Sequence, residues 1–299
     1  MSETSAAPER EAPPAGVVGQ LTPRVRRLVA PNPSPFTFTG TCSYLIGEGE
    51  VAILDPGPDS DAHLAALLEA TRGERIAAIV ITHTHRDHSP LARRLREATS
   101  APIVGARPHV FTEGPQQGLD ASHDRDYAPD RVLREGDELA VGGLTLKAIE
   151  TPGHAANHLV FACAEENALF SGDHVMAWST SVVAPPDGSM SDYMASLEKL
   201  RARDEEIYWP GHGGPVRDPR RYVRGLIGHR RQREASILTR LEAGPTTIPE
   251  IVARVYSGVD PRLHGAAGLS TLAHLDDLVT RGLVTRDDGP PLVVAYRRV

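Results

Sequence analysis

The stretch THTHRDH, which ends at His88, places three histidines and an aspartate within six positions directly after the apolar run IAAIVI. Such a run is typical of a strand that is buried on both faces. His83 and His85 are two residues apart, so on an extended segment their side chains project to the same side and can hold one ion together. Asp87 and His88 follow the strand, where the chain turns, and are placed to serve a second ion. Three imidazoles in one turn have little structural use, so the pattern favours metal ligation over coincidence.

Three further strand ends carry a metal-ligating side chain. The motifs TPGH, SGD and WPGHG follow apolar runs and supply His154, Asp173 and His212. Each lies in a glycine-containing turn, where the backbone can approach an ion without a clashing Cβ. Taken singly, each motif is an ordinary turn, and the histidine cluster before it makes ligation the better interpretation. Together the side chains form a nitrogen and oxygen donor set, which suits zinc, with manganese or iron as alternatives.

Short strand-like runs alternate with amphipathic helical patterns along most of the chain. The segment 60–73 has a capping serine, leucines at helical spacing and a terminal glycine, and the segment 89–98 begins with Ser89 as the expected cap. Residues 107–130 are irregular and rich in Gly, Pro and Asp, which predicts a surface excursion. The alternation predicts an α/β layered domain with both sheet faces covered.

The length of 299 residues predicts one large domain and a smaller one. Residues 1–22 are small, polar and proline-rich and are expected to be a disordered leader, with a catalytic domain over 23–216 and a second domain over 217–299. The leader lacks the apolar core of a signal peptide, and no run is long enough to cross a bilayer, so no membrane partner is expected. Cys42 and Cys163 form no Cys-x-x-Cys pair, which excludes a thiolate zinc cage and indicates a cytoplasmic protein.

Five motifs in order, from LDPG through HTHRDH, TPGH and SGD to PGHG, resemble those of the metallo-β-lactamase superfamily across roughly residues 36–215. The resemblance implies an αβ/βα sandwich with a pair of metal ions, two Zn²⁺ in the first instance, at one edge. It implies that the first ion is held by His83, His85 and His154, and the second by Asp87, His88 and His212. Asp173 would bridge the two ions, and Asp55 would be a buried carboxylate that fixes the ligand loop. Cys42 stands where relatives usually carry asparagine, which is a departure from the pattern.

Two such metals share a water and lower its pKa towards neutrality, so the expected reaction is attack of a metal-bridged hydroxide on a carbonyl or phosphorus. Asp87 would be the catalytic residue that orients this nucleophile. Flavodiiron relatives typically carry a glutamate at the position of His85, so the histidine favours hydrolysis over redox chemistry. Asp173 and the missing signal peptide both argue against a role in antibiotic resistance.

The region after PGHGG predicts a small winged-helix domain. A long helix runs from Pro219 to about Glu242, Thr247 and Glu250 match a capping box, and a third helix ends at Gly282 before a hairpin around DDGPP. This arrangement resembles the branch that contains a mitochondrial β-lactamase-like endoribonuclease and fungal polyketide thioesterases.

The third helix of this region carries Asp276 and Asp277 against a single Arg281, which is poor for reading bases or phosphates. Sequence-specific DNA binding is therefore not expected, and we expect the domain to pack on the core and shape the pocket entrance. The long helix is expected to present a solvated arginine face; its members are Arg220, Arg221, Arg224, Arg230, Arg231 and Arg233.

Three functions remain open on the sequence. Residues 1–218 carry a net charge of −12, because the whole chain carries −7 and residues 219–299 carry +5. This acidic body favours hydrolysis of an ester or thioester of a small acyl compound over cleavage of single-stranded RNA. The branch resemblance and the arginine helix motivate the RNA hypothesis. The third is a non-enzymatic, metal-responsive winged-helix regulator. A homo-oligomer is also open.

The remaining polar candidates are expected to have supporting or ordinary roles. Asn157, His158 and His174 flank the expected ligands and are assigned to packing or to contacts with ligands, while Trp178, Ser179 and Thr180 are expected to line the pocket. The other histidines have no companions in sequence and are expected to be ordinary: His63, His109, His123, His229, His264 and His274.

Overall fold

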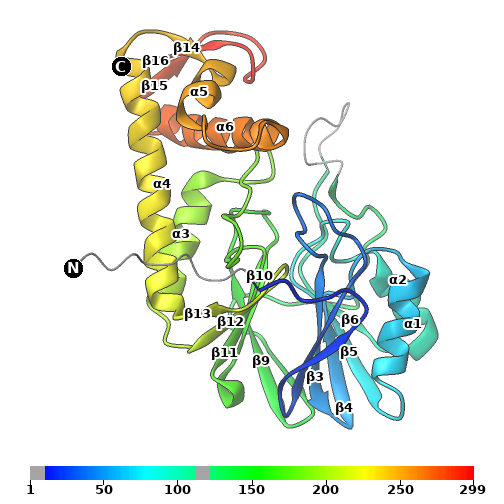
Figure 1. The fold of residues 1–299 in the computed structure, drawn as a ribbon. Coiled ribbons are helices and arrows are strands. Elements are labelled where there is room, and N and C mark those ends of the chain that lie inside the picture. The colour runs from blue at the N-terminus through cyan, green and yellow to red at the C-terminus, as the bar shows by residue number, and fades with distance from the viewer. Residues whose placement is uncertain (1–10, 112–121) are drawn as a thin grey trace.

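The computed structural model describes residues 11–111 and 122–299. Residues 1–10 of the expected leader and residues 112–121 of the expected excursion lie outside the described residues. Two β-sheets lie face to face with helices on their outer sides, and a smaller helical part with a short sheet lies at one end (Figure 1). The αβ/βα layering expected from the sequence is therefore present.

The first sheet has seven strands in chain order, antiparallel from β1 to β4 and parallel from β4 to β7. Its strands are β1 Val18–Thr22, β2 Val25–Val29, β3 Cys42–Glu48, β4 Glu50–Leu54, β5 Arg75–Ile81, β6 Ile103–Gly105 and β7 Arg131–Val132. Helices α1 Asp61–Ala70 and α2 Leu91–Thr99 pack on its outer face. Ser60 caps α1, as its sequence predicts, by accepting a hydrogen bond from the backbone N–H of His63.

The second sheet has six strands in the order β13-β12-β11-β10-β9-β8. Its strands are β8 Glu138–Val141, β9 Leu144–Glu150, β10 Leu159–Cys163, β11 Ala168–Gly172, β12 Ile207–Pro210 and β13 Val216–Arg217, with a short 3₁₀ turn η2 Ala164–Glu166. Only β11 and β12 pair in parallel, because helix α3 Met190–Arg201 connects them across the outer face.

Strand β5 explains why its apolar run has no alternation. Ala78 and Val80 point into the core between the two sheets, whereas Ile79 and Ile81 pack against α1 and α2 on the outer face. Both faces of the strand are buried, so both sets of alternating positions must be apolar. The strand ends at Ile81, and the polar ligand motif begins at the next residue.

The C-terminal part is a winged helix built on a long helix. Its elements are α4 Pro219–Glu242, β14 Thr246–Thr247, α5 Ile248–Val255, η3 Pro261–Leu263, α6 His264–Thr280, β15 Val284–Arg286 and β16 Ala295–Arg298, with the strands ordered β14-β16-β15. The capping box is formed between Thr247 and Glu250. Among the described residues, no helix is both long and apolar enough to cross a membrane.

The winged helix packs directly on the two-sheet part, as expected. Ala273 of α6 is buried in the same cluster as Tyr193 and Leu197 of α3 and Val223 of α4. Most of the α6 residues from Ala267 to Leu278 are buried. Little of α6 is left exposed, so this helix lacks the free face with which a winged helix enters a DNA groove.

Three local expectations differ from the structure. Val18–Thr22 forms edge strand β1, although the sequence assigns it to the disordered leader; its side chains are half-exposed, and its order comes from pairing with β2. Ser89 does not cap α2, because its hydroxyl donates to Asp124 instead. Arg230 is not on a solvated face, since it is 3% exposed and donates to the carbonyl of Ser181.

Candidate metal centre

The ligand motifs meet at one edge of the sandwich, where several strands end. His83 follows β5, His154 follows β9, Asp173 follows β11 and His212 follows β12. Gly211 makes this approach possible, because a Cβ at that position would lie 2.4 Å from Asp173 Oδ1 and 2.8 Å from His88 Cε1. The structure thus brings together all seven residues that the sequence singled out.

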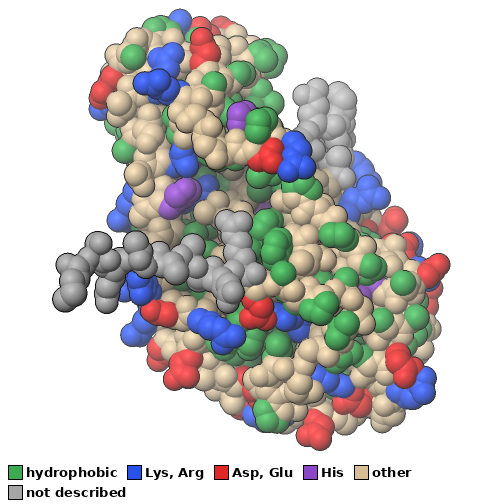
Figure 2. Space-filling model, viewed as in Figure 1, with side chains coloured by type: hydrophobic (Ala, Val, Ile, Leu, Met, Phe, Trp, Pro, Cys, Tyr) green, Lys and Arg blue, Asp and Glu red, His purple; other side chains and the backbone are tan. Residues whose placement is uncertain are grey.

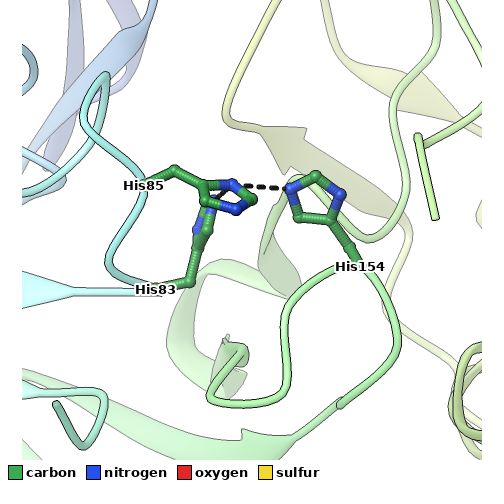
Figure 3. Close-up of side chains that lie close together, drawn as sticks. All are labelled: His83, His85 and His154. Carbon is green, nitrogen blue, oxygen red and sulfur yellow. Dashed lines mark hydrogen bonds between the residues drawn. The ribbon is translucent and has the colours of Figure 1, made fainter. Parts of the chain in front are cut away.

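The first group consists of His83, His85 and His154 (Figure 3). Nδ1 of His85 lies 3.0 Å from Nε2 of His83 and 3.1 Å from Nε2 of His154. Ligand atoms around a tetrahedral zinc ion at its usual bond length lie about 3.3 Å apart, so the spacing fits one shared ion. Burial, together with the neighbouring histidines, holds the pKa values of His83 and His85 well below their usual range, which keeps both rings neutral and their lone pairs available.

The second group consists of Asp87, His88, Asp173 and His212. Nε2 of His212 lies 3.3 Å from Nε2 of His88 and 3.2 Å from Oδ2 of Asp87. These spacings match those of the first group. The side chains of His88 and His212 are almost fully buried, whereas that of Asp87 is 28% exposed and faces the adjoining cavity.

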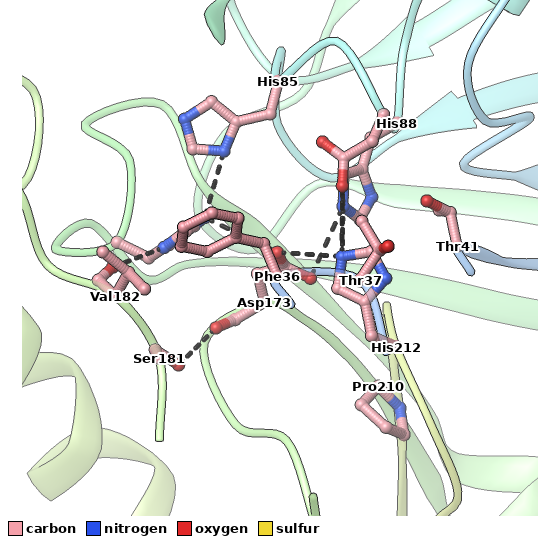
Figure 4. Close-up of polar contacts among 12 residues, drawn as sticks. Phe36, Thr37, Thr41, His85, His88, Asp173, Ser181, Val182, Pro210 and His212 are labelled. Carbon is pink, nitrogen blue, oxygen red and sulfur yellow. Dashed lines mark hydrogen bonds and ion pairs between the residues drawn. The ribbon is translucent and has the colours of Figure 1, made fainter. Parts of the chain in front are cut away.

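Asp173 lies between the two groups (Figure 4). Its Oδ2 is 3.6 Å from Nε2 of His154 in the first group and 3.3 Å from Nε2 of His212 in the second. Its Oδ1 is buried without a hydrogen-bond partner, 3.4 Å from Nε2 of His88. A buried carboxylate oxygen without a donor is costly, so its environment suits a cation.

The second group attracts positive charge. Although burial opposes it, the charges of Asp173 and Asp87 raise the pKa of His212 to about 9 and the pKa of His88 well above its usual range. Burial also opposes ionisation of Asp87, yet His88 and His212 hold its pKa below the usual range. Protons on the two histidines compensate the carboxylates in the metal-free chain, and a divalent cation would compensate them in their place.

Outer contacts orient three of the ligand rings, those of His88, His154 and His212. Metal-ligating histidines usually donate their second ring N–H to an oxygen atom, which fixes the ring. Here Nδ1 of His154 contacts the carbonyl of Val182 at 2.7 Å, and Nδ1 of His212 contacts that of Gly40 at 3.2 Å. Nδ1 of His88 contacts Asp55 at 2.9 Å.

Asp55 lies buried beside the ligand loop. It is 2% exposed, and it accepts hydrogen bonds from the backbone N–H of Thr82 at 2.8 Å and from the Thr82 hydroxyl at 2.7 Å. One carboxylate thereby connects the start of the ligand loop to His88. His158 also supports the site, since its Nε2 accepts the N–H of Asp173 at 3.1 Å.

Cys42, the departure from the family pattern, lies beside the loop of His212. Its backbone N–H donates to the carbonyl of Gly211 at 2.7 Å, and its thiol contacts the carbonyl of Gly213 at 3.5 Å. Burial raises the pKa of this thiol to about 11. The side chain is therefore a neutral packing group.

Sequence reasoning missed a third group beside the site. His109 and His123 were expected to be ordinary, yet their rings stack at 3.7 Å and both contact Asp187, at 3.3 Å and 3.1 Å. His123 also contacts the hydroxyl of Thr84, and Asp187 accepts the N–H of Ala156. The group therefore connects the loop that carries His83 and His85 to the loop that carries His154.

A cavity of about 800 Å³ opens from the two ligand groups towards the winged helix. His85, Asp87 and His154 lie at one end, and residues of η3 and α6 lie at the other. Trp178, Ser179 and Thr180 line it, as expected. Figure 2 shows the hollow between the C-terminal part and the two-sheet part, with hydrophobic side chains around it.

Comparisons with known families agree with this arrangement. The metallo-beta-lactamase superfamily profile matches residues 37–212, and the beta-lactamase associated winged helix domain profile matches residues 247–290. The chain is 32% identical over 267 residues to the lactamase-like protein adaB of Aspergillus niger, covering 83% of this chain and 78% of the relative. It is 31% identical over 240 residues to an atrochrysone carboxyl ACP thioesterase of Aspergillus fumigatus, covering 78% of this chain and 70% of the relative.

Solved structures show the same fold. A metallo-beta-lactamase family protein from Thermus thermophilus has a TM-score of 0.77 and 27% identity, covering 94% of this chain and all of that protein. A beta-lactamase domain protein from Burkholderia ambifaria has a TM-score of 0.81 and 22% identity, covering 97% of each chain. Both similarities extend across the two-sheet part and the winged helix.

Proposed function

The chain belongs to the metallo-β-lactamase superfamily, and we propose that it is a binuclear zinc hydrolase that cleaves an ester or thioester of a small acyl compound. The relatives named as acyl carrier protein thioesterases support the acyl class of substrate. The observation that carries the proposal is the cavity that opens from both ligand groups and has a largely apolar lining.

We assign His83, His85 and His154 to one ion, and Asp87, His88 and His212 to the other, with Asp173 shared between them. The distances within each group and the partnerless oxygen of Asp173 support this assignment. When bound, two such ions supply a water that loses its proton near neutral pH and an electrophile for the substrate carbonyl. Manganese or iron would suit the same donors, and zinc is the ion we propose.

The catalytic group of the chain itself is Asp87. Its carboxylate is the most exposed of the ligand groups and lines the cavity, where an attacking water must enter. In this proposal Asp87 orients the water and accepts its proton at a carboxylate oxygen. The proton then returns to the departing thiolate or alkoxide, so that water and thioester become a carboxylic acid and a thiol.

The charges of the cavity favour a small acyl substrate over RNA. Beyond the ligand groups and the ions that they would hold, the described lining carries two cations, Arg86 and Arg233. A single-stranded RNA site requires a positively charged groove that follows the backbone. Arg230, one of the arginines that motivated the RNA hypothesis, is buried, and Arg231 pairs with Glu198. The buried α6 gives the regulator hypothesis no support.

The test is a substrate panel with the metal-loaded protein. Acyl-CoA, acyl-glutathione and lactone substrates should show turnover that a chelator abolishes and zinc restores. Asp87→Ala should reduce kcat at least about a hundredfold, as expected for loss of a general base. The control Asp59→Ala removes an exposed carboxylate that pairs with Arg94 and should leave kcat unchanged. Cleavage of an unstructured RNA with silence across the acyl panel would reject the proposal.

A further inference from the structure

We propose that the winged helix supplies a binding wall for the acyl chain of the substrate, formed by Val259, Leu263 and Leu269. The acyl chain would lie along the cavity from the metal centre to η3 and α6. This inference rests on the proposed thioester hydrolysis, and it assigns to the C-terminal part a role in substrate selection. The ligand of the wall is an unbranched or aromatic apolar acyl group.

The position of the cavity supports this role. One cavity is lined at one end by Asp87 and His154 and at the other by Val259 and Leu263, which belong to the winged helix. A substrate whose carbonyl lies at the ligand groups therefore has one side of its body against the winged helix. The volume of about 800 Å³ is within the range of cavities that bind small molecules.

The chemistry of the wall selects the acyl arm of a thioester over its thiol arm. Val259, Leu263 and Leu269 face the cavity from the winged helix, and Phe36 and Met176 face it from the two-sheet part. Pantetheine and glutathione arms carry amides that need hydrogen-bond partners, and these aliphatic side chains offer none. The polar side chains that line the cavity from the C-terminal part are His229, Arg233, Tyr256 and Ser270, so the selection rests on the aliphatic stretch of the wall. An alkyl or aromatic chain gains affinity from both surfaces, at about fourfold for each buried methylene.

Internal contacts fix the wall in place. Arg233 of α4 donates to the carbonyl of Val255, and its guanidinium lies 4.1 Å above the ring of Tyr256. These contacts connect α4 to the end of α5, directly before the segment that carries Val259 and Leu263. A wall held in this way is preorganised, so binding of the acyl chain does not have to order it first.

Small residues at the start of α6 leave room for the chain. Ala266 and Ala267 line the cavity at its far end. A larger side chain at Ala266 would shorten the cavity without touching the ligand groups. The change Ala266→Phe therefore tests the end of the cavity that the winged helix lines.

The experiment measures kcat/KM for acyl N-acetylcysteamine thioesters with acyl chains from two to twelve carbons. The zinc-loaded protein should gain about fourfold per methylene until the chain fills the cavity. Ala266→Phe should keep the acetyl value within about twofold and lose at least about tenfold with octanoyl. The control Val293→Phe adds the same ring to an exposed position of the winged helix, 64% exposed, and should match the unmodified protein.

A binding measurement separates this inference from the proposed reaction. Trp178 lines the cavity, so octanoate should change its fluorescence saturably in the unmodified protein and in Val293→Phe. Ala266→Phe should bind octanoate with an affinity at least tenfold lower. Trp178→Phe should show no fluorescence change. Octanoate binding with no thioesterase activity would reject the proposed hydrolysis and support the proposed acyl-binding wall. Acetyl hydrolysis whose kcat/KM does not change with acyl-chain length would reject the proposed wall and support the proposed hydrolysis. Equal dependence on chain length in Ala266→Phe and Val293→Phe would do the same.

Discussion

The carboxylate of Asp55 is buried and accepts hydrogen bonds from two residues, Thr82 and His88. Thr82 donates to it through its backbone and hydroxyl, and the ring of His88 donates to it through Nδ1. Its φ of +48° is unusual for a residue other than glycine, so the surrounding contacts hold the backbone in place. The carboxylate therefore sets where the ligand loop begins and which nitrogen of His88 faces the site.

Asp55→Asn should lower zinc affinity by about ten- to a hundredfold. An amide offers only one acceptor atom, so either Thr82 or His88 would face an NH₂ group instead of an oxygen. Competition with a fluorescent chelator measures the affinity. Asp61→Asn, at an exposed carboxylate of α1, serves as the control, and equal affinities in the two variants would contradict the role of Asp55.

A second prediction about a single residue concerns Asp187. Although burial opposes ionisation, the hydrogen bond with His123 lowers the pKa of Asp187 to about 2, so the group is a carboxylate at neutral pH. Asp187→Asn should weaken binding of the ion at His83, His85 and His154 by about tenfold, because both ligand loops lose their shared anchor. Asp126→Asn, an exposed change in the same segment as His123, should not. Spectroscopy of the cobalt-substituted protein during metal titration would report which ion is lost.

The residues of the site were predictable to different degrees. His83, His154 and Asp173 each lie a few residues at most beyond the end of a strand. The local pattern therefore places each near a strand end, and the sheets bring these ends together. His123 and Asp187 come from irregular segments without periodicity, 64 residues apart in sequence, and only the packed structure brings them into contact. Polar contacts between loops leave no spacing signal of this kind.

At the scale of elements, ends set by local contacts were predictable and those set by distant contacts were not. The capping box fixes the start of α5, and Asp218 caps the start of α4, both within a few residues of sequence. Ser89 was expected to cap α2 but donates to Asp124, which the sequence does not place beside it. Arg230 lies among exposed arginines on α4, and its burial depends on the loop of Ser181.

Helix α6 carries a group that makes stability depend on pH. His274 is 1% exposed, and burial, followed by the charge of Arg230, lowers its pKa to about 3. The unfolded chain binds a proton near pH 6.5 whereas the folded chain does not, so this contribution to stability is complete above pH 6.5 and is lost as the pH falls towards 3. Between pH 6.5 and 4.5 the loss should be about 2–3 kcal/mol.

His274→Leu should therefore unfold in urea with a weaker dependence on pH than the unmodified protein, both measured in chelator from pH 7.5 to 4.5. His264→Leu, at a half-buried position at the start of the same helix, should keep the original dependence. Parallel curves for His274→Leu and the unmodified protein would show that His274 is not the group responsible.

At the scale of the whole molecule, we propose a catalytic body that includes β1 and ends at residue 216, and a winged helix over 217–299; the two share one cavity. The contacts of α6 with α3, and of α4 with both parts, support their acting as a unit. A cytoplasmic location remains a prediction from the sequence. Cys42 and Cys163 are both buried and free.

Metal binding should stabilise this unit. A cation would neutralise the carboxylates of Asp87 and Asp173, which lie among the ligand histidines. Zinc should therefore raise the thermal midpoint of the chelated protein. An ion present at a thousandfold above its dissociation constant contributes about 4 kcal/mol. The combined change of His88→Ala and His212→Ala should remove the part due to the second ion, and a midpoint that zinc leaves unchanged would contradict the proposed sites.

The most direct test is a crystal structure of the zinc-reconstituted protein with anomalous data at the zinc edge and elemental analysis of the same sample. We predict two ions per chain, one within reach of His83, His85 and His154, the other of Asp87, His88 and His212, with Asp173 between them. A single ion, or ions bound away from these side chains after zinc is supplied, would contradict the binuclear centre.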